Sequence, residues 1–100
     1  MKNKYELLVI IHPEKDSSKV ISQIEKLIKK FGGKVETKDE WGMRQLSYPI
    51  KKQGEGYYTL FIVELEASKV KSLGEALNIE EEVLRQMIIK AQSVKRKVQK

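Results

Sequence analysis

A chain of 100 residues makes one domain with one compact core, and a chain without cysteine has no disulfide, thiolate nucleophile or cysteine-ligated metal. Hydrophobic residues make up 40% of it and charged residues 34%, which excludes full disorder, and no apolar run approaches the roughly 20 residues of a membrane span. The formal net charge of +6 favours an anionic partner such as nucleic acid or a membrane surface.

Residues 5–12 alternate in side-chain facing, are rich in β-branched residues and predict a strand that Pro13 stops. The apolar stretch ends at His12–Pro13 without a small-residue cleavage site, so we expect no signal peptide and a cytoplasmic protein. His12 is the only histidine. We expect it to be an ordinary exposed side chain, because the sequence points to no partner for catalysis or metal binding.

A helix follows this strand. Residues 20–31 carry one apolar stripe with spacings of one, three and four residues, which is typical of an amphipathic helix. Asp16, Ser17 or Ser18 can cap its beginning. Gly32–Gly33 supplies the left-handed residue that ends it.

The second strand is long and irregular. Residues 34–48 predict this strand, which Pro49 and a loop over residues 51–56 terminate. Gly42 indicates a bulge, and Pro49 fits only an edge or a strand end, so we expect an edge strand that bends. Trp41, beside the bulge, is either a core residue or an anchor for a partner.

Residues 57–65 predict the third strand, in which the polar Glu64 turns the odd-numbered residues toward the helices. Ser68 caps a second helix and Asn78 is its terminator. Residues 83–91 predict the fourth strand, whose facing is ambiguous because Arg85 and Gln86 are adjacent and polar.

This order of elements predicts an α+β fold, the ferredoxin-like βαββαβ sandwich, with two helices on one face of a four-stranded antiparallel sheet. The expected strand order is 4-1-3-2, which leaves the second and fourth strands at the edges. Residues 1–92 form the single domain. Residues 93–100 form a basic C-terminal tail that we expect to be flexible.

Three motifs have ordinary structural interpretations. Glu80, Glu81 and Glu82 form a solvated turn. Gly54 and Gly56 form a hairpin turn and no phosphate cradle, since the lysine and Ser/Thr that follow such a cradle are missing. Residues 55–62 loosely resemble the aromatic signature of the RNA-recognition motif, but the basic position holds Glu55 and the aromatics face the helices.

The block from Trp41 to Lys52, WGMRQLSYPIKK, is the most specific motif in the chain. With it the chain resembles the bacterial-type small-subunit ribosomal protein six family, in unbroken order over roughly residues 4–92. The other matching segments are Tyr5-Glu6, Gly33-Lys34-Val35, Gly56-Tyr57-Tyr58, Leu77-Asn78-Ile79 and Val83 to Met87. Gln45 stands where some family members carry a second arginine.

The resemblance implies the ferredoxin-like fold, no enzymatic activity and no cofactor. It implies a place in the small ribosomal subunit and cooperative binding of central-domain ribosomal RNA as a heterodimer with small-subunit ribosomal protein eighteen. By match to the family, Arg44, Lys52 and Arg85 are candidates for the RNA or partner surface. The remaining candidates are assigned on their positive charge alone. They are Lys2, Lys4, Lys51, Lys90, Lys95, Arg96 and Lys97.

Two surfaces are open to the partner protein. The sheet face away from the helices carries Leu8, Ile10, Leu60 and Ile62, a set too apolar for water and suited to docking. The edge of the second strand can equally accept a partner by strand addition.

Two other functions remain as alternatives on this fold. One is a small phosphatase, although the sequence shows no anion-binding loop after the first strand. The other is an oligomeric regulator or small-ligand-binding domain, because ferredoxin-like domains often pair by sheet edges or faces.

Overall fold

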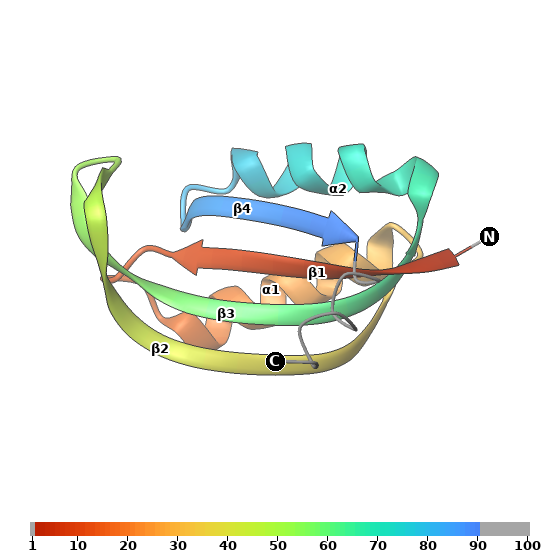
Figure 1. The fold of residues 1–100 in the computed structure, drawn as a ribbon, viewed down its shortest axis with the longest axis horizontal. Helices are drawn as coiled ribbons and strands as arrows, with labels where there is room; N and C mark the ends of the chain where they lie inside the picture. The colour runs from red at the N-terminus through yellow and green to blue at the C-terminus, as the bar shows by residue number, and fades with distance from the viewer. Residues whose placement is uncertain (1, 91–100) are drawn as a thin grey trace, which may run out of the picture.

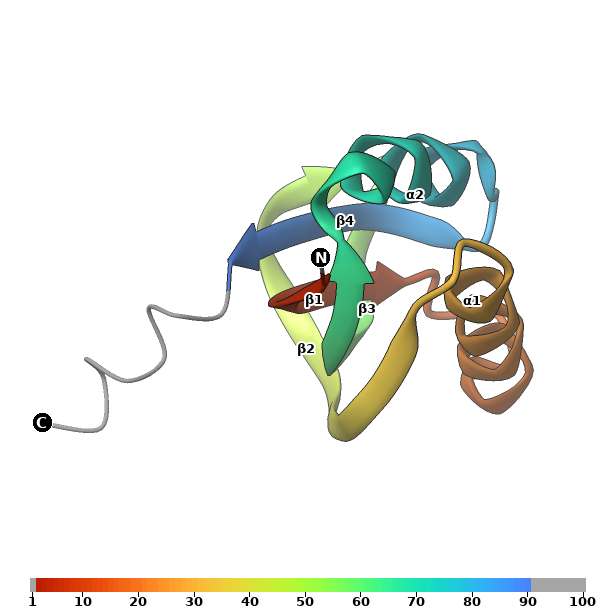
Figure 2. The same cartoon turned by 90° about the vertical axis from the view of Figure 1, so that its right-hand side faces the viewer.

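The computed structural model describes residues 2–90. Its elements are β1 (Lys2–Ile11), α1 (Ser17–Lys30), β2 (Lys34–Ile50), β3 (Gln53–Glu66), α2 (Ala67–Ile79) and β4 (Val83–Lys90). The strands form one antiparallel sheet in the order β2-β3-β1-β4, and both helices cover the same face (Figures 1 and 2). The predicted ferredoxin-like sandwich and its strand order are confirmed. No helix in the described range is long and apolar enough to cross a membrane.

The predicted tail lies beyond Lys90, so Lys95, Arg96 and Lys97 fall outside the described residues. The backbone of Lys2 begins β1, but its side chain is also outside the description. The domain that the structure describes is therefore residues 2–90.

The core lies between the helices and one face of the sheet. The odd-numbered residues of β1 from Tyr5 onward and of β3 from Tyr57 onward point into it, as the position of Glu64 predicts, and Phe61 is fully buried. Burying a side chain of this size contributes roughly 1.5–3 kcal/mol. The other buried residues of this core include Leu7, Val9, Ile11, Val63 and Leu65 from the strands, and Val20, Ile21, Ile24, Ile28, Leu73 and Leu77 from the helices.

The two helices begin differently. Asp16 is the cap of α1, and its Oδ1 accepts hydrogen bonds from the backbone N–H groups of Ser18 (3.1 Å) and Lys19 (3.5 Å). The prediction that Ser68 caps α2 is wrong, because the helix already starts at Ala67. Glu66 occupies the cap position, and its side chain makes no capping hydrogen bond. The physical reason is that β3 runs directly into α2 with no loop between them.

The β2–β3 hairpin corrects the sequence prediction. β2 continues through Pro49 to Ile50 and β3 starts at Gln53, so the turn is only Lys51–Lys52. Both turn residues have positive φ (49° and 69°), as in the two-residue turns that suit the twist of hairpin strands. Gly54 and Gly56 are therefore strand residues and form no turn. Pro49 is tolerated because β2 is an edge strand whose pairing is interrupted between Gln45 and Ile50.

The predicted bulge at Gly42 is present. Gly42 has φ +91°, and the register with β3 shifts between Glu40 and Gly42. Further shifts occur between Val35 and Thr37 and between Gln45 and Ile50. Bulges bend a strand, and the hairpin end curves away from the plane of the sheet (Figure 1).

A shift in the β1–β4 pairing settles the ambiguous facing of β4. Ile10 pairs with Arg85, whereas Ile11 pairs with Val83, so Leu84 is an extra residue. Val83 and Leu84 are consequently both buried. From Arg85 onward the strand alternates regularly, with Arg85 on the same face as Ile10.

We expect Gly56→Ala to destabilise the protein by about 1–3 kcal/mol, as overpacking does in a filled interior. A Cβ at this buried glycine would overlap Cγ2 of Ile10, a branched group with little rotamer freedom. Gly54→Ala is the matched control on the same strand, because nothing lies within 4 Å of its Cβ position. Urea unfolding of both variants is the measurement, and equal midpoints would contradict the close packing.

Candidate functional site

The face of the sheet away from the helices, called the open face here, is hollowed by a groove. The groove has a volume of about 250 Å³ and lies where the hairpin end bends over β1 and β4. Its lining is mostly apolar. The main residues of this open-face groove are Leu8 and Ile10 of β1, Leu46, Tyr48 and Ile50 of β2, Tyr58 of β3, and Arg85 and Met87 of β4.

The four predicted docking residues do not share one environment. Leu8 and Ile10 line the groove, whereas Leu60 and Ile62 are half-buried elsewhere on the open face. Ile10 is only 6% exposed, which corrects the expectation of an exposed docking residue. The cause is the hairpin, whose Gly56 lies directly against the Ile10 side chain.

Trp41 lies on the open face and is no core residue. Its ring stacks on Tyr58 with centroids 6.1 Å apart and an interplanar angle of 12°, and 40% of the residue remains exposed. The guanidinium carbon of Arg44 lies 5.7 Å from the Trp41 ring centroid, within the range of a cation–π interaction. Nε1 of Trp41 donates a hydrogen bond to Asp39 Oδ2 (3.1 Å). The exposed ring fits the interpretation as an anchor for a partner.

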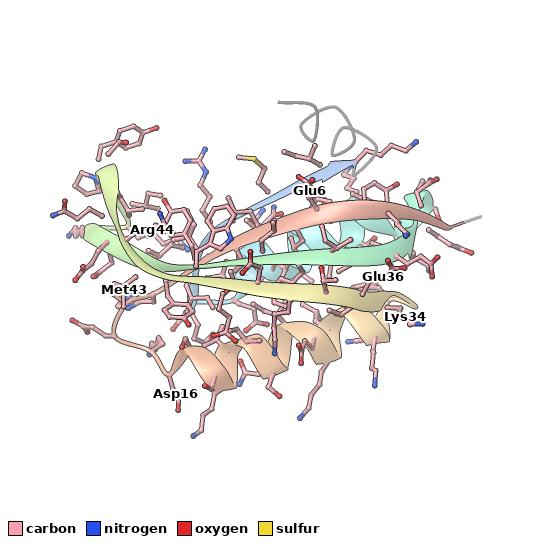
Figure 3. The ribbon with its side chains drawn as sticks, turned by 60° about the horizontal axis from the view of Figure 1, so that its bottom comes forward. Glu6, Asp16, Lys34, Glu36, Met43 and Arg44 are labelled. Carbon is pink, nitrogen blue, oxygen red and sulfur yellow. The ribbon has the colours of Figure 1, made fainter. Side chains whose placement is uncertain are left out.

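The bulge explains how Trp41 reaches this face. Glu40 pairs with Thr59 and Gly42 pairs with Tyr58, so Trp41 is the extra residue between them. After the bulge, successive side chains alternate again, with Met43 on the side of α1 and Arg44 on the other side (Figure 3). Glycine at position 42 permits the positive φ that this arrangement requires.

Four predicted cations gather at the hairpin end of the sheet. Arg85 lines the groove, Arg44 contacts Trp41, and Lys52 is exposed in the turn. Nζ of Lys51 donates a hydrogen bond to the carbonyl oxygen of Val83 (3.2 Å) and thereby ties the turn to the start of β4. Lys51 thus has a structural role beside any contact with a ligand.

Two other predicted cations lie at the opposite end. Lys4 pairs with Glu64 across the sheet, and its Nζ forms an ion pair with Glu36 Oε1 at 3.2 Å. Lys90 pairs with Tyr5 at the last position of β4. The fold therefore divides the expected basic surface, and neither residue joins the groove.

Tyr57 was not predicted as part of the site. Its hydroxyl donates a hydrogen bond of 2.7 Å to Glu40 Oε1 and so joins β3 to β2 beside the bulge. This hydrogen bond raises the pKa of Tyr57 above 10.0, and burial and the charge of Glu40 act in the same direction. Phe61 is fully buried and Tyr57 packs against the core, so neither is placed to stack on a base.

The groove residues of the hairpin were missed as well. The sequence carried a signal for them, because Leu46 and Tyr48 alternate within the predicted strand and Ile50 continues the same period of two beyond its predicted end. Pro49 was interpreted as the end of the strand, so the continuation to Ile50 was not predicted. Met87 was missed because the facing of β4 depends on the extra residue Leu84.

The remaining sequence candidates have structural roles. Nδ1 of His12 accepts a hydrogen bond from the Glu14 N–H (3.1 Å), and the His12 N–H donates to the Glu82 carbonyl oxygen (2.7 Å). His12 is half-buried and not fully exposed as expected. Among residues 2–90 no group of three His, Asp or Glu residues is placed to hold a metal ion.

The family model described as ribosomal protein S6 matches residues 4–90. The chain belongs to the ribosomal protein S6 family. The small ribosomal subunit protein bS6 of Corynebacterium aurimucosum is 38% identical over 92 residues, which cover 89% of this chain and 96% of that protein. The protein of the same name from Carboxydothermus hydrogenoformans is 38% identical over 93 residues, with coverages of 90% and 97%.

The fold has a solved counterpart. The crystal structure of the 30S ribosomal protein S6 from Thermotoga maritima superposes with a TM-score of 0.82 over the full length of both chains, at 24% sequence identity. The likeness shows the shared ferredoxin-like fold. Membership of a family of ribosomal proteins also confirms the expectation that this S6-family chain is not an enzyme.

We expect the free energy of unfolding of Tyr57→Phe to decline less steeply with rising pH than that of the native protein. A raised folded-state pKa means that the native state holds its proton longer than the unfolded chain, so this stabilisation is present below pH 10 and is lost as pH rises through the raised value. Urea unfolding between pH 8 and 11 should therefore show a steeper decline for the native sequence than for the variant. Glu40→Gln should act in the same direction, and parallel curves for all three proteins would contradict the role of the pair.

Proposed function

We propose that this protein is a structural component of the small ribosomal subunit that binds central-domain ribosomal RNA together with small-subunit ribosomal protein eighteen. The observation that carries the proposal is the surface at the hairpin end, where an apolar groove and exposed cations lie side by side. Membership of the ribosomal protein S6 family supports it independently. The site of action that we propose is the ribosome in the cytoplasm.

The cations suit the RNA backbone. Arg44 and Lys52 are exposed, and Arg85 of β4 is exposed at the groove. Lysine and arginine neutralise phosphates and release condensed counterions, so the affinity falls steeply with added salt. Such contacts position a protein on RNA without reading its sequence. Specificity then comes from the shape of a folded RNA junction.

The apolar groove suits the partner protein. A concave surface lined by Leu8, Tyr48 and Met87 is costly to leave in water and accepts apolar side chains of a second protein. The competing surface, the outer edge of β2, carries three register shifts along its length. Bulges interrupt the regular backbone spacing that strand addition needs. We therefore place the partner in the groove.

Adjacency of the two surfaces provides a mechanism for cooperative binding. Arg85 lines the groove and is also a candidate RNA contact, so a partner seated there lies directly beside the RNA surface and can contact both. Each ligand would then raise the affinity of the other, with a coupling of typically about 1–3 kcal/mol. The coupling is reciprocal, because it is a property of the ternary complex.

The tagged protein should sediment with small ribosomal subunits, and Arg44→Ala combined with Lys52→Ala should reduce that association while the fold survives. Removing two phosphate contacts should also flatten the dependence of RNA affinity on salt. Lys69→Ala with Lys71→Ala is the control. Both lysines are exposed on α2, so their replacement removes the same charge from another surface. Sucrose-gradient sedimentation and filter binding across salt are the measurements. An absence of the native protein from the subunit fraction would contradict the proposal.

Met87→Lys should weaken binding of protein eighteen by at least about tenfold, roughly 1.4 kcal/mol, because it places a charge in the apolar groove. Met43→Lys is the matched control, since Met43 is 47% exposed and Met87 45%, but Met43 lies on the α1 side. Fluorescence of Trp41, the only tryptophan, reports docking on the open face. Equal affinities of the two variants for protein eighteen would mean that the partner binds at another surface.

A further inference from the structure

A second basic surface lies on the helix-covered side of the protein, away from the open-face groove. A groove with a volume of about 600 Å³ runs between the C-terminal half of α1 and the start of β2. Its walls carry Lys26 and Lys29 from the helix and Lys34 from the strand, and all three are exposed. Figure 3 shows Lys34 beside the C-terminal end of α1. These three residues define the lysine groove.

Among the described residues, one acid stands opposite a lysine of the groove: Lys34 pairs with Glu64 between β2 and β3, although no ion pair joins the two side chains. Glu25 is the only acid in α1 and the only acid that lines the groove. Its Oε2 is 3.3 Å from Nζ of Lys38, so another lysine already compensates it. No ion pair joins an acid to Lys26, Lys29 or Lys34 in the part of the chain that the structure describes. The groove therefore presents a net positive surface to solvent.

The helix continues this surface beyond the groove. Val20, Ile24 and Ile28 are buried, which leaves the opposite side of α1 to polar residues. On that side Lys19 and Lys26 are seven residues apart, about two turns, and share one line along the helix. Lys30 follows four residues after Lys26 on the same side. The three lysines together span about 16 Å at 1.5 Å per residue.

We propose that the lysine groove binds the phosphate backbone of double-helical RNA, as a second RNA-contacting surface on this protein. The inference rests on the proposed function only in that RNA is the partner, and it uses none of the open-face residues. Lysine is a flexible point charge that suits phosphate oxygens. No aromatic residue lines the groove, so it lacks the stacking platform with which proteins hold single-stranded bases. Binding at this surface is therefore independent of RNA sequence.

The same observations argue against two other anionic partners. A membrane-bound helix inserts an apolar face beneath the lipid headgroups, but the apolar face of α1 is buried in the core. A protein interface normally has an apolar or aromatic centre. Val35 lines this groove, but no aromatic residue and none of the exposed large hydrophobic residues of the described chain does. A polyanion with regularly spaced charges fits the surface best.

One structural role of these lysines shapes the test. Lys29 and Lys30 lie in the last turn of α1, where positive charge offsets the partial negative charge of the helix end. Removing them would change stability as well as binding. Lys26 and Lys34 lie outside that turn, and replacing both keeps the helix end intact.

The experiment compares Lys26→Gln with Lys34→Gln, made together, against Lys69→Gln with Lys71→Gln on α2. Both double variants change exposed lysines and lower the net charge equally. Binding to a 20-base-pair RNA duplex of arbitrary sequence is followed by fluorescence anisotropy at several salt concentrations. Each phosphate contact contributes about 0.7–0.9 to the slope of log affinity against log salt. The groove variant should therefore lose roughly 1 to 2 from the slope, and the α2 variant should match the native protein.

Equal slopes for the two double variants would overturn the proposal. Lys26→Arg with Lys34→Arg keeps the charge and should bind like the native protein, and a loss there would also count against phosphate contact. Equal groove-dependent binding to vesicles of anionic phospholipid would overturn the choice of RNA. The Arg44→Ala and Lys52→Ala variant should keep its groove-dependent slope, so a failure of subunit association and a failure of the lysine groove are separate results.

Discussion

The close contact between the backbone of Gly56 and the side chain of Ile10 holds the hairpin end against the sheet, and the open-face site depends on it. A Cβ at position 56 would overlap the Ile10 side chain and push the hairpin end away from β1. The groove would then lose the wall formed by Leu46, Tyr48 and Ile50. A glycine is required in this strand because the space that a Cβ would occupy is already filled. A single packing constraint thus creates a concave surface on a sheet that would otherwise be open.

Polar contacts also hold the hairpin end in place against the sheet. Tyr57 holds Glu40 beside the bulge, and Lys51 holds the turn against the start of β4. Between these two points, Trp41 is stacked on Tyr58, and the guanidinium group of Arg44 lies over the Trp41 ring. The cation is therefore supported by an ordered aromatic ring and does not depend on a salt bridge. An arginine held in this way keeps its charge available to an anionic ligand.

Positive charge is distributed over two layers of the sandwich. One set of cations, including Arg44 and Arg85, lies with the apolar groove on the open face. The lysine groove lies between α1 and the start of β2, and Lys26, Lys29 and Lys34 line it. The two surfaces therefore suit different contacts: a shaped complex of RNA and protein on one side, and the RNA backbone alone on the other. The two proposals together assign two segments of a folded RNA to a small domain with a net charge of +6.

The order of the elements, the strand order, the core-facing side of β3 and the bulge at Gly42 were all predictable from the amino-acid sequence. These follow from local patterns, namely the periods of two and 3.6, the cap at Asp16 and the steric needs of glycine and proline. The family also followed from the block at Trp41 to Lys52. The extension of the hairpin to Ile50, the burial of Ile10 and the ion pair of Lys4 with Glu36 became visible only in the folded structure. The reason is that these features depend on contacts between segments far apart in the chain, and a local pattern does not record which side chain another strand will cover.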